Sequence, residues 1–427
     1  MPQQIKIPVW IAILININII IGAGFFVVVP QISASGGVLA PFTWLLCGIV
    51  LLPLVIVFAK LAHTFPSAGG IYVYSLKQLG PLWGFISGWG YYIGCAAINA
   101  TVIHAFCQEI QKFPILSSFF QTTHLYGLGL DFVVVLFFML LNLLNVKFLE
   151  GFQIGLIILK TIPILTVIIA VPFLYNLNSL SAVTTNFSGF LSNIPLVFFA
   201  YIGIEACCSI ADKIENGKKN ASKVIFISFA LTAIIYTATQ LALFLIGDSS
   251  GACSFFSILP KLTSNQILIM GGNYLIHASI LLSFLGGFYG MFYFNNWNLF
   301  AIAQEKHIIF SSALTKINKN HMPWVCVLFQ SGLAFILLIL FASEKYSLAI
   351  MGDFGTIIAY LLSVIAFLTL YKNLSGYLAL LSSLALMFLC TQELFSYGLN
   401  YLLPFLGIIA LGILAHKINA WKNEQSL

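Results

Sequence analysis

Long apolar runs alternate along the chain with short polar segments rich in Gly, Pro, Asn, Ser and Lys. A helix needs about 20 residues to cross a hydrocarbon core of about 30 Å, and many of the runs reach that length. The pattern therefore predicts an all-α integral membrane protein with twelve transmembrane helices, of which the eleventh is short. The expected spans are residues 9–30, 38–60, 84–111, 129–147, 153–175, 189–212, 223–246, 268–303, 323–342, 347–371, 377–391 and 394–416.

The composition supports the same class of protein. Of the 427 residues, 60% are hydrophobic and only 7% are charged, too few polar side chains to cover a water-soluble globule. The first apolar run continues past the length of a signal-peptide core and lacks a small-residue cleavage site, so we expect it to be the first helix. No polar stretch between helices is long enough for a soluble domain, which predicts one transmembrane unit over residues 1–427, embedded in the lipid bilayer.

All eighteen basic residues are Lys, and their distribution predicts an orientation. With the amino terminus inside, fourteen fall in inner segments, three fall in outer segments, and Lys160 lies within the fifth helix. Because short cytoplasmic loops retain positive charge, we expect a multi-pass protein of a bacterial inner membrane with both termini in the cytoplasm. No loop combines a long basic run with aromatic residues, so no nucleic-acid partner is expected.

The residue types that most often carry chemistry show no catalytic or metal-binding arrangement. Eight Cys occur without a CxxC pair and mostly within apolar runs, so we interpret them as packing residues. His104 and His277 lie in expected helices without the paired spacing of a metal site, and we interpret them as helix-packing residues. The sequence thus predicts no enzyme, no catalytic residue, no metal and no cofactor. A channel is a further alternative, but it would be expected to show a repeated filter or a ring of like residues.

Two expected helices contain small residues at mid-membrane depth. The first carries Gly22, Ala23 and Gly24, and the sixth carries Gly203 beside Glu205. Small residues in membrane helices also allow close helix packing, which is the alternative interpretation. Because the two stretches lie at matching depths, we predict two broken helices that form a substrate site. Unwound backbone there exposes N–H groups and carbonyls, and half-helix N-termini favour a carboxylate such as that of an amino acid.

The two broken helices are expected to run in opposite directions through the membrane. This predicts five helices followed by five of inverted topology, a 5+5 inverted repeat. The first unit covers residues 8–175 and the second covers residues 189–371. Residues 377–418 then form two additional helices.

Three of the charged residues within expected helices are candidates for function, because an ionisable group in a membrane helix usually marks an ion, proton or substrate path. For Glu205 we predict a gating or proton-linked role, with a structural hydrogen-bonding role as the alternative. Lys160 lies about 12 Å into the fifth helix, and the alternative to a buried function is that its side chain extends to the inner surface. Asp353, near the outer end of the tenth helix, would attract a cationic substrate or be an ordinary interfacial carboxylate.

The segments from Lys6 to Tyr371 resemble the amino acid/polyamine/organocation superfamily. Its first-helix glycine motif corresponds to residues 21–26, its Pro-Ser-x-Gly-Gly-x-Tyr pattern to residues 66–72, and its Phe-x-Gly-x-Glu stretch to residues 201–205, which begins here with Tyr201. The Arg common near the end of helix eight is missing. The resemblance implies the inverted-repeat fold of the sodium-coupled leucine transporter and transport by alternating access.

Within this superfamily the chain looks most like the basic amino acid/polyamine antiporters. Asn99 matches an Asn that contacts substrate in that branch, and Tyr91 matches a gating Tyr. Phe199 stands where a Trp is typical of the branch, which places the specificity inherited from that Trp in question. Lys160 resembles a Lys of proton-coupled members whose ammonium occupies the place of a sodium ion.

The same resemblance implies a set of backbone contacts to the substrate. The N–H groups of Ala23 and Gly24 would hold its carboxylate, and the carbonyls of Ile20, Phe199 and Ile202 would hold its ammonium.

The sequence therefore predicts a carrier of a small amine-bearing solute, an amino acid or a polyamine. Antiport of a basic amino acid against its amine is the first interpretation, and proton-coupled uptake of a neutral amino acid is the alternative. No deep carboxylate other than Glu205 is available to neutralise a cationic side chain. Protons as coupling ions and a homodimeric assembly both stay open at this point.

Overall fold

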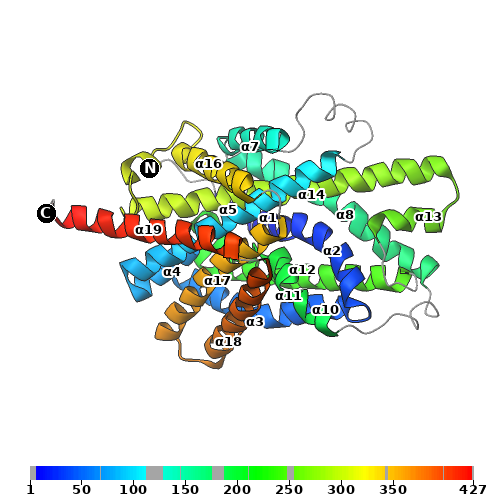
Figure 1. Ribbon diagram of the computed structural model, residues 1–427, viewed down its shortest axis with the longest axis horizontal. Coiled ribbons are helices and arrows are strands. Elements are labelled where there is room, and N and C mark those ends of the chain that lie inside the picture. The colour runs from blue at the N-terminus through cyan, green and yellow to red at the C-terminus, as the bar shows by residue number, and fades with distance from the viewer. Residues whose placement is uncertain are drawn as a thin grey trace.

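The computed structural model describes residues 6–67, 69–111, 128–144, 146–175, 187–209, 211–247, 254–341, 345–397 and 399–425. Within these ranges all elements are helices, and the only β-type pairing is an isolated bridge between Ile7 and Ile214. Long helices run side by side through the molecule, and the C-terminal helix extends away from the rest (Figure 1).

Most expected spans correspond to one helix, whereas the first corresponds to the pair α1 and α2 and the sixth to a series of short helices. The first half contains α1 Val9–Ile20, α2 Ala23–Gly36, α3 Ala40–Thr64, α4 Gly70–Leu79, α5 Pro81–Gln111, α7 Leu128–Asn142, α8 Val146–Leu174, α10 Phe187–Ser192, α11 Ile194–Tyr201, and the 3₁₀ helices η1 Ala206–Ser209 and η2 Ala211–Lys213. The second half contains α12 Gly217–Ile246, η3 Phe255–Ser257, α13 Ile258–Leu262, α14 Gln266–Gln304, α15 Ser311–Leu314, α16 Trp324–Phe341, α17 Lys345–Leu370, α18 Leu374–Tyr397 and α19 Leu399–Gln425.

The described residues contain ten helices long and apolar enough to cross a membrane, and an eleventh if the bent pair of α1 and α2 is one span. The remaining expected span is represented by α7, which has 15 residues. Its predicted range, 129–147, includes residue 145, which lies outside the described residues. Ala68 of the second motif and Cys253 also lie outside them. The count of twelve and the 5+5 repeat stay predictions.

The eleventh expected helix is longer than the sequence pattern predicts. Its expected range, 377–391, ends before the polar pair Gln392 and Glu393, whereas α18 continues to Tyr397. The reason is that Leu394, one residue further, is fully buried and keeps the helix packed on the core. The short helix α4 has no counterpart among the expected spans.

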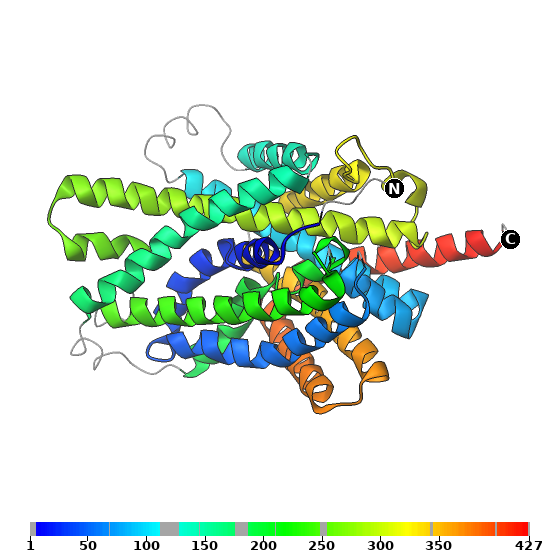
Figure 2. The same ribbon diagram turned by 180° about the vertical axis from the view of Figure 1, so that it is seen from behind.

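Close contact between α5 and α17 forms the centre of the packing, and Figures 1 and 2 show α1 beside α12 and α14 from opposite sides. A Cβ added to Gly94 would lie 2.7 Å from the carbonyl oxygen of Gly352, and one added to Gly355 would lie 2.7 Å from the carbonyl oxygen of Gly90. The two backbones therefore approach through glycine, as is common between membrane helices.

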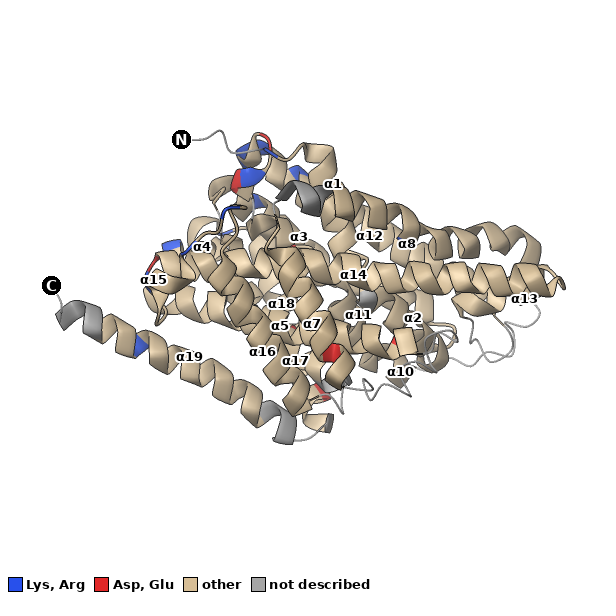
Figure 3. Ribbon diagram, turned by 90° about the horizontal axis from the view of Figure 1, so that it is seen from above, with Lys and Arg blue, Asp and Glu red and all other residues tan. Residues whose placement is uncertain are grey.

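Charge is concentrated at one end of the molecule. In Figure 3 most blue Lys positions lie around the amino terminus, α4 and α15, whereas the opposite end, with α10 and α13, shows little blue. We call the first of these the Lys-rich end. Between the ends the helices expose large apolar side chains, such as Phe173 at 75% and Leu381 at 65%, as expected of surfaces that face lipid.

Candidate substrate site

The first break separates α1 from α2. The helix α1 ends at Ile20, α2 begins at Ala23, and the two axes are bent by 46°. The Gly22 N–H turns back to donate to the carbonyl oxygen of Ile20 at 2.8 Å. A Cβ at Gly24 would lie 3.0 Å from Cα of Ala200, so this segment also packs closely against α11. The small residues at 22–24 therefore form a helix break, as predicted, and also allow close helix packing, which was the alternative interpretation.

The second break lies between α11 and η1. The helix α11 ends at Tyr201, and Ile202 donates its N–H to the Phe199 carbonyl at 3.3 Å. Gly203 has a φ of 109°, a backbone conformation that favours glycine. A Cβ at this position would lie 2.8 Å from Cγ2 of Ile19 in α1. The two breaks are therefore in contact, although 181 positions separate Gly22 from Gly203.

Tyr236 of α12 joins the two broken helices. Its hydroxyl contacts the carbonyl oxygens of Ile20, at 2.7 Å, and Ala200, at 2.9 Å. Its ring stacks on Phe25 with centroids 4.4 Å apart and an interplanar angle of 3°. The sequence analysis did not identify this residue, because nothing in the local pattern distinguishes it from other aromatic residues of the seventh helix.

A cavity of about 30 Å³ lies where the two breaks meet. Its lining consists of Ile19, Ile20, Gly22, Gly24, Ile98, Asn99, Val102, Phe199, Ala200, Ile202, Gly287, Phe288 and Met291. Six of the eight predicted substrate-binding residues are in this set. Gly203 lies beside it, and the Ala23 side chain is outside the described residues. The volume is sufficient for one or two water molecules but not for an amino acid, so this conformation is closed around the site.

The contribution of α14 to this lining was missed by the sequence analysis. Gly287, Phe288 and Met291 complete the wall, and a Cβ at Gly22 would lie 3.5 Å from Cα of Gly287. The glycine pair at 286 and 287 within the eighth expected span was the available signal.

Hydrogen-bonding groups at the cavity are partly unpaired. Asn99 is 1% exposed, and neither its side-chain oxygen nor its nitrogen has a hydrogen-bond partner within the described chain. The first N–H groups of α2 have no intrahelical acceptor, and Gly22 supplies no side-chain cap. A helix N-terminus and an unpaired amide at one small cavity suit a ligand with a carboxylate.

The expected carbonyl contacts are less available than predicted. The Ile20 carbonyl already accepts from the Gly22 N–H and from Tyr236, so both of its lone pairs are engaged. The Phe199 carbonyl accepts one hydrogen bond, from Ile202. An ammonium would bind at Ile20 only after one of its present bonds is broken.

Glu205 is fully buried behind the second break. Its Oε1 accepts from the Tyr91 hydroxyl at 2.7 Å, and its Oε2 accepts from the Tyr360 hydroxyl and, at 3.2 Å, from the Gly203 N–H. The structural hydrogen-bonding role considered for Glu205 is thus present, and it links the predicted gating residue Tyr91 to the break. Tyr360 of α17 was not identified from the sequence. Neither Glu205 nor Tyr91 lines the cavity.

Lys160 of α8 is 1% exposed and does not extend to the surface, so that interpretation is wrong. Its Nζ donates to the carbonyl oxygens of Asn18, at 2.7 Å, and Ile21. These carbonyls lie at the C-terminal end of α1, where the break leaves them without intrahelical donors and where the helix dipole favours a cation.

Asp353 does not lie at a solvent-facing position. It is fully buried in α17, and neither carboxylate oxygen has a hydrogen-bond partner among the residues that the structure describes. The interpretation of Asp353 as an ordinary interfacial carboxylate is therefore wrong, because this part of α17 is enclosed by neighbouring helices. Attraction of a cationic substrate stays a prediction.

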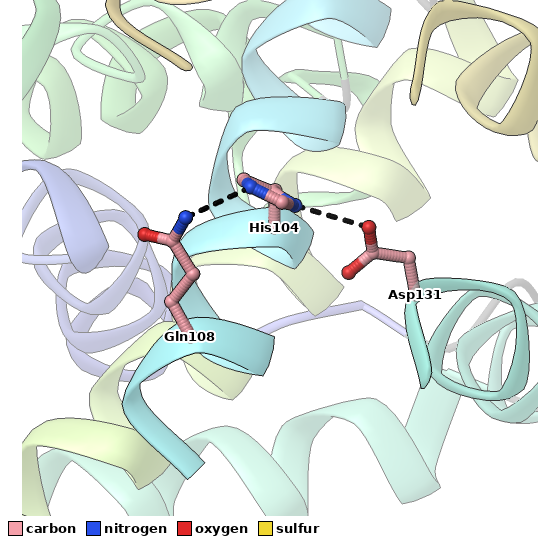
Figure 4. A network of polar contacts seen from close by, with 3 residues as sticks. All are labelled: His104, Gln108 and Asp131. Atoms are coloured by element: carbon pink, nitrogen blue, oxygen red, sulfur yellow. Dashed lines mark hydrogen bonds and ion pairs between the residues drawn. The ribbon is translucent and has the colours of Figure 1, made fainter. Parts of the chain in front are cut away.

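The two intramembrane His residues make packing hydrogen bonds, as expected. Figure 4 shows His104 of α5 between Asp131 of α7, at 3.0 Å, and Gln108, at 2.9 Å. His277 contacts the carbonyl oxygen of Glu109 at 3.1 Å. No group of three or more potential metal ligands occurs in the ranges that the structure covers.

At the Lys-rich end, η2 joins the amino-terminal segment to α14. Ile7 donates its N–H to the Lys213 carbonyl at 2.8 Å, and Lys213 Nζ lies 3.3 Å from the ring centroid of Trp297. Burial lowers the pKa of Lys213 to about 8, and neighbouring Asp212 opposes this shift. Burial likewise raises the pKa of Asp212, against the effect of Lys213. The cation–π contact therefore ties η2 to α14 at this end of the molecule.

Two broken helices meet at a small cavity within a bundle of helices of membrane-spanning length, an arrangement typical of polytopic membrane carriers. The sequence profile of the amino acid permease family matches residues 7–417. The chain therefore belongs to the amino acid permease family and is an amino acid transporter.

Curated relatives cover most of the chain at low identity. The serine/threonine exchanger SteT of Bacillus subtilis (strain 168) is 25% identical over 371 residues, which cover 84% of this chain and 81% of SteT. The branched-chain amino acid permease BcaP of the same organism is 24% identical over 394 residues, covering 84% and 79%. An aspartate-proton symporter, also from that strain, is 28% identical over 235 residues, covering 53% and 45%. None of these three relatives is named as a transporter of basic amino acids or polyamines, so they do not show that the chain belongs to that branch.

Proposed function

We propose that this protein carries a small neutral amino acid across the membrane by alternating access. The observation that carries the proposal is the cavity at the two helix breaks, where the free N-terminus of α2 and the unpaired Asn99 amide suit an α-carboxylate. The rest of the lining is apolar and contains no charged side chain. A neutral side chain fits that lining, since a cationic one would lose hydration there without gaining a partner.

The similarity to SteT and BcaP supports the same substrate class, because their names describe serine/threonine exchange and branched-chain amino acid transport. Exchange of a basic amino acid for its amine is the second candidate. It is favoured by Asn99, which lines the cavity as that branch requires. It is disfavoured by the lack of a free carboxylate at the cavity, since Glu205 does not line it and its oxygens are engaged by two tyrosine hydroxyls and a backbone N–H.

Counterflow in proteoliposomes tests this function directly. Vesicles loaded with unlabelled serine, threonine, leucine, lysine or putrescine would be diluted into trace labelled solute. We expect accelerated uptake for at least one neutral amino acid and none for putrescine. Accelerated uptake of lysine and putrescine alone would favour the second candidate, and no acceleration with any amino acid would refute both.

For coupling, we propose that Lys160 holds a constitutive positive charge at the end of α1, so that sodium is not required. Its two carbonyl contacts, at Asn18 and Ile21, support this role. Lys160→Ala should create a sodium dependence of uptake or abolish transport, and full sodium-independent activity would contradict the proposal.

We also propose that Glu205 takes part in proton-linked gating through Tyr91 and Tyr360. Glu205→Gln should flatten the pH dependence of transport, because the amide does not titrate. Tyr360→Phe, which removes one donor and leaves the carboxylate, is the comparison variant. An unchanged pH profile in Glu205→Gln would leave this residue with the hydrogen-bonding role alone.

A further inference from the structure

A groove of about 610 Å³ lies between the end of α3 and the start of α12, and it shares no lining residue with the site cavity. Both helices are apolar enough to span the membrane. The apolar part of the groove includes Ile56, Phe226 and Ile227, of which Phe226 is 47% exposed and Ile227 is 39% exposed. Because these side chains belong to spanning helices, this part of the groove faces lipid tails rather than water.

The other part of the groove is basic. Lys60 and His63 come from the last two turns of α3, and Lys223 comes from the second turn of α12, all three exposed. No acidic residue lines the groove. Lys219 lies one helical turn before Lys223 and therefore on the same face of α12. The end of α3 and the start of α12, both spanning helices, place these charges at one membrane–water boundary.

We propose that this groove binds an anionic phospholipid, with its phosphate between Lys60 and Lys223 and an acyl chain along Phe226 and Ile227. Basic pockets between membrane helices bind such headgroups, and juxtamembrane Lys residues attract them. The charge complementarity specifies a headgroup with net negative charge, such as phosphatidylglycerol or cardiolipin. A choline headgroup would bring its own cation against the two ammonium groups.

The groove also lies on helices that support the substrate site. At its floor Ser222 of α12 donates to the Ala59 carbonyl of α3 at 2.7 Å. Further along the same two helices, Trp44 of α3 donates to the Gln240 side chain of α12 at 3.0 Å. The same helix α12 carries Tyr236, which contacts both breaks. A lipid bound between α3 and α12 would therefore stabilise the helix pair on which the closed site rests. The binding itself does not depend on the proposed substrate.

The test uses the full chain purified in a mild detergent, with native mass spectrometry during titration of phosphatidylglycerol, cardiolipin or phosphatidylcholine. We expect the variant Lys60→Gln/Lys223→Gln to bind the two anionic lipids roughly 10- to 30-fold more weakly and to bind phosphatidylcholine as the wild type does. The matched control is Lys316→Gln/Lys319→Gln, which removes two exposed charges elsewhere at the Lys-rich end. It should retain wild-type lipid affinity.

Equal losses in both double variants would show a diffuse charge effect and overturn the proposal, as would unchanged anionic-lipid affinity in Lys60→Gln/Lys223→Gln. Glycerol 3-phosphate serves as the soluble headgroup probe. If it competes as well as phosphatidylglycerol does, the groove is a site for free phosphate and the lipid assignment is wrong. Thermal melting of each variant without lipid verifies that the fold is retained.

Discussion

Buried polar side chains around the site differ in whether they have hydrogen-bond partners. Glu205 accepts three hydrogen bonds, whereas the Asn99 amide has none among the described residues. An unpaired buried polar group costs about 1–3 kcal/mol, so a bound substrate that pairs with Asn99 recovers part of that energy. Asn99 is therefore the side chain at which the closed structure most directly indicates a ligand.

Replacing Asn99 by Ala should weaken substrate binding without destabilising the protein. We expect KM for the transported amino acid to rise roughly 5- to 10-fold, because one or two hydrogen bonds to the substrate are lost. Thermal stability should stay the same or rise, since an unpaired polar group is removed. Asn142→Ala, at a buried Asn outside the cavity that donates to the Phe138 carbonyl, is the control. A lower Tm with unchanged KM in Asn99→Ala would contradict the assignment.

Lys213 should give a pH dependence of stability at alkaline pH. Its folded pKa of about 8 lies below the ordinary value of 10.5, so the unfolded state binds more protons between these values. The free energy of unfolding should therefore rise with pH over this interval, and the penalty of burying the charge should be fully present below pH 8. Thermal melting of wild type and Lys213→Gln checks this. The Tm of wild type minus the Tm of Lys213→Gln should increase as pH is raised from about 7 to about 10.

The control for this measurement is Lys219→Gln, which changes an exposed Lys on α12. Its Tm difference from wild type should not vary with pH. If Lys213→Gln behaves in the same way, Lys213 is hydrated in the folded protein, and the contact with Trp297 does not hold it.

At the scale of elements, glycine determines how closely the central helices approach. Helix α5 packs on α17 through Gly90, Gly94, Gly352 and Gly355, with no room for a methyl group at Gly94. The same helices carry Tyr91 and Tyr360, whose hydroxyls meet at Glu205. The spacing of α5 and α17 thus places both donors within reach of one carboxylate.

Gly94→Ala should lower stability, because its Cβ would lie 2.7 Å from the Gly352 carbonyl oxygen and 2.9 Å from the Thr356 nitrogen. Overpacking of this kind costs about 1–3 kcal/mol. Gly332→Ala in α16 is the matched control, since nothing lies within 4 Å of its added Cβ. Alanine there should leave Tm unchanged or raise it slightly. Equal effects of the two substitutions would show that α5 and α17 adjust freely.

At the scale of the whole molecule, Lys residues gather at one end of a bundle with apolar sides (Figure 3). This distribution supports the proposal that the Lys-rich end and both termini face the cytoplasm. The same end carries the Lys213 contact and the basic part of the groove between α3 and α12. Lipid binding in the groove would then occur at the cytoplasmic membrane surface.

The orientation can be measured with single Cys substitutions and a membrane-impermeant maleimide. The seven described Cys residues are all buried, and the unsubstituted protein serves as the background. Lys261→Cys, on α13, should be labelled in intact cells, and Lys316→Cys only after the membrane is opened. The reverse pattern would invert the proposed topology.

The sequence by itself determined the class of protein, the positions of nearly all helices, and the two breaks. These features depend on local properties: apolar length matched to a bilayer, and glycine where a helix cannot continue. The end of α18 was misjudged, because burial of Leu394 through tertiary packing outweighs a local polar pair.

Only the tertiary structure decided which groups meet at the site. The sequence did not indicate that Tyr236 would contact both breaks, that α14 would form a wall, or that Tyr360 would reach Glu205. It likewise left the Lys160 ammonium open between the inner surface and a buried position, and only the structure places it on the carbonyls of Asn18 and Ile21. Such contacts join residues far apart in the chain, and helix periodicity specifies which face is apolar but not which helix lies against it.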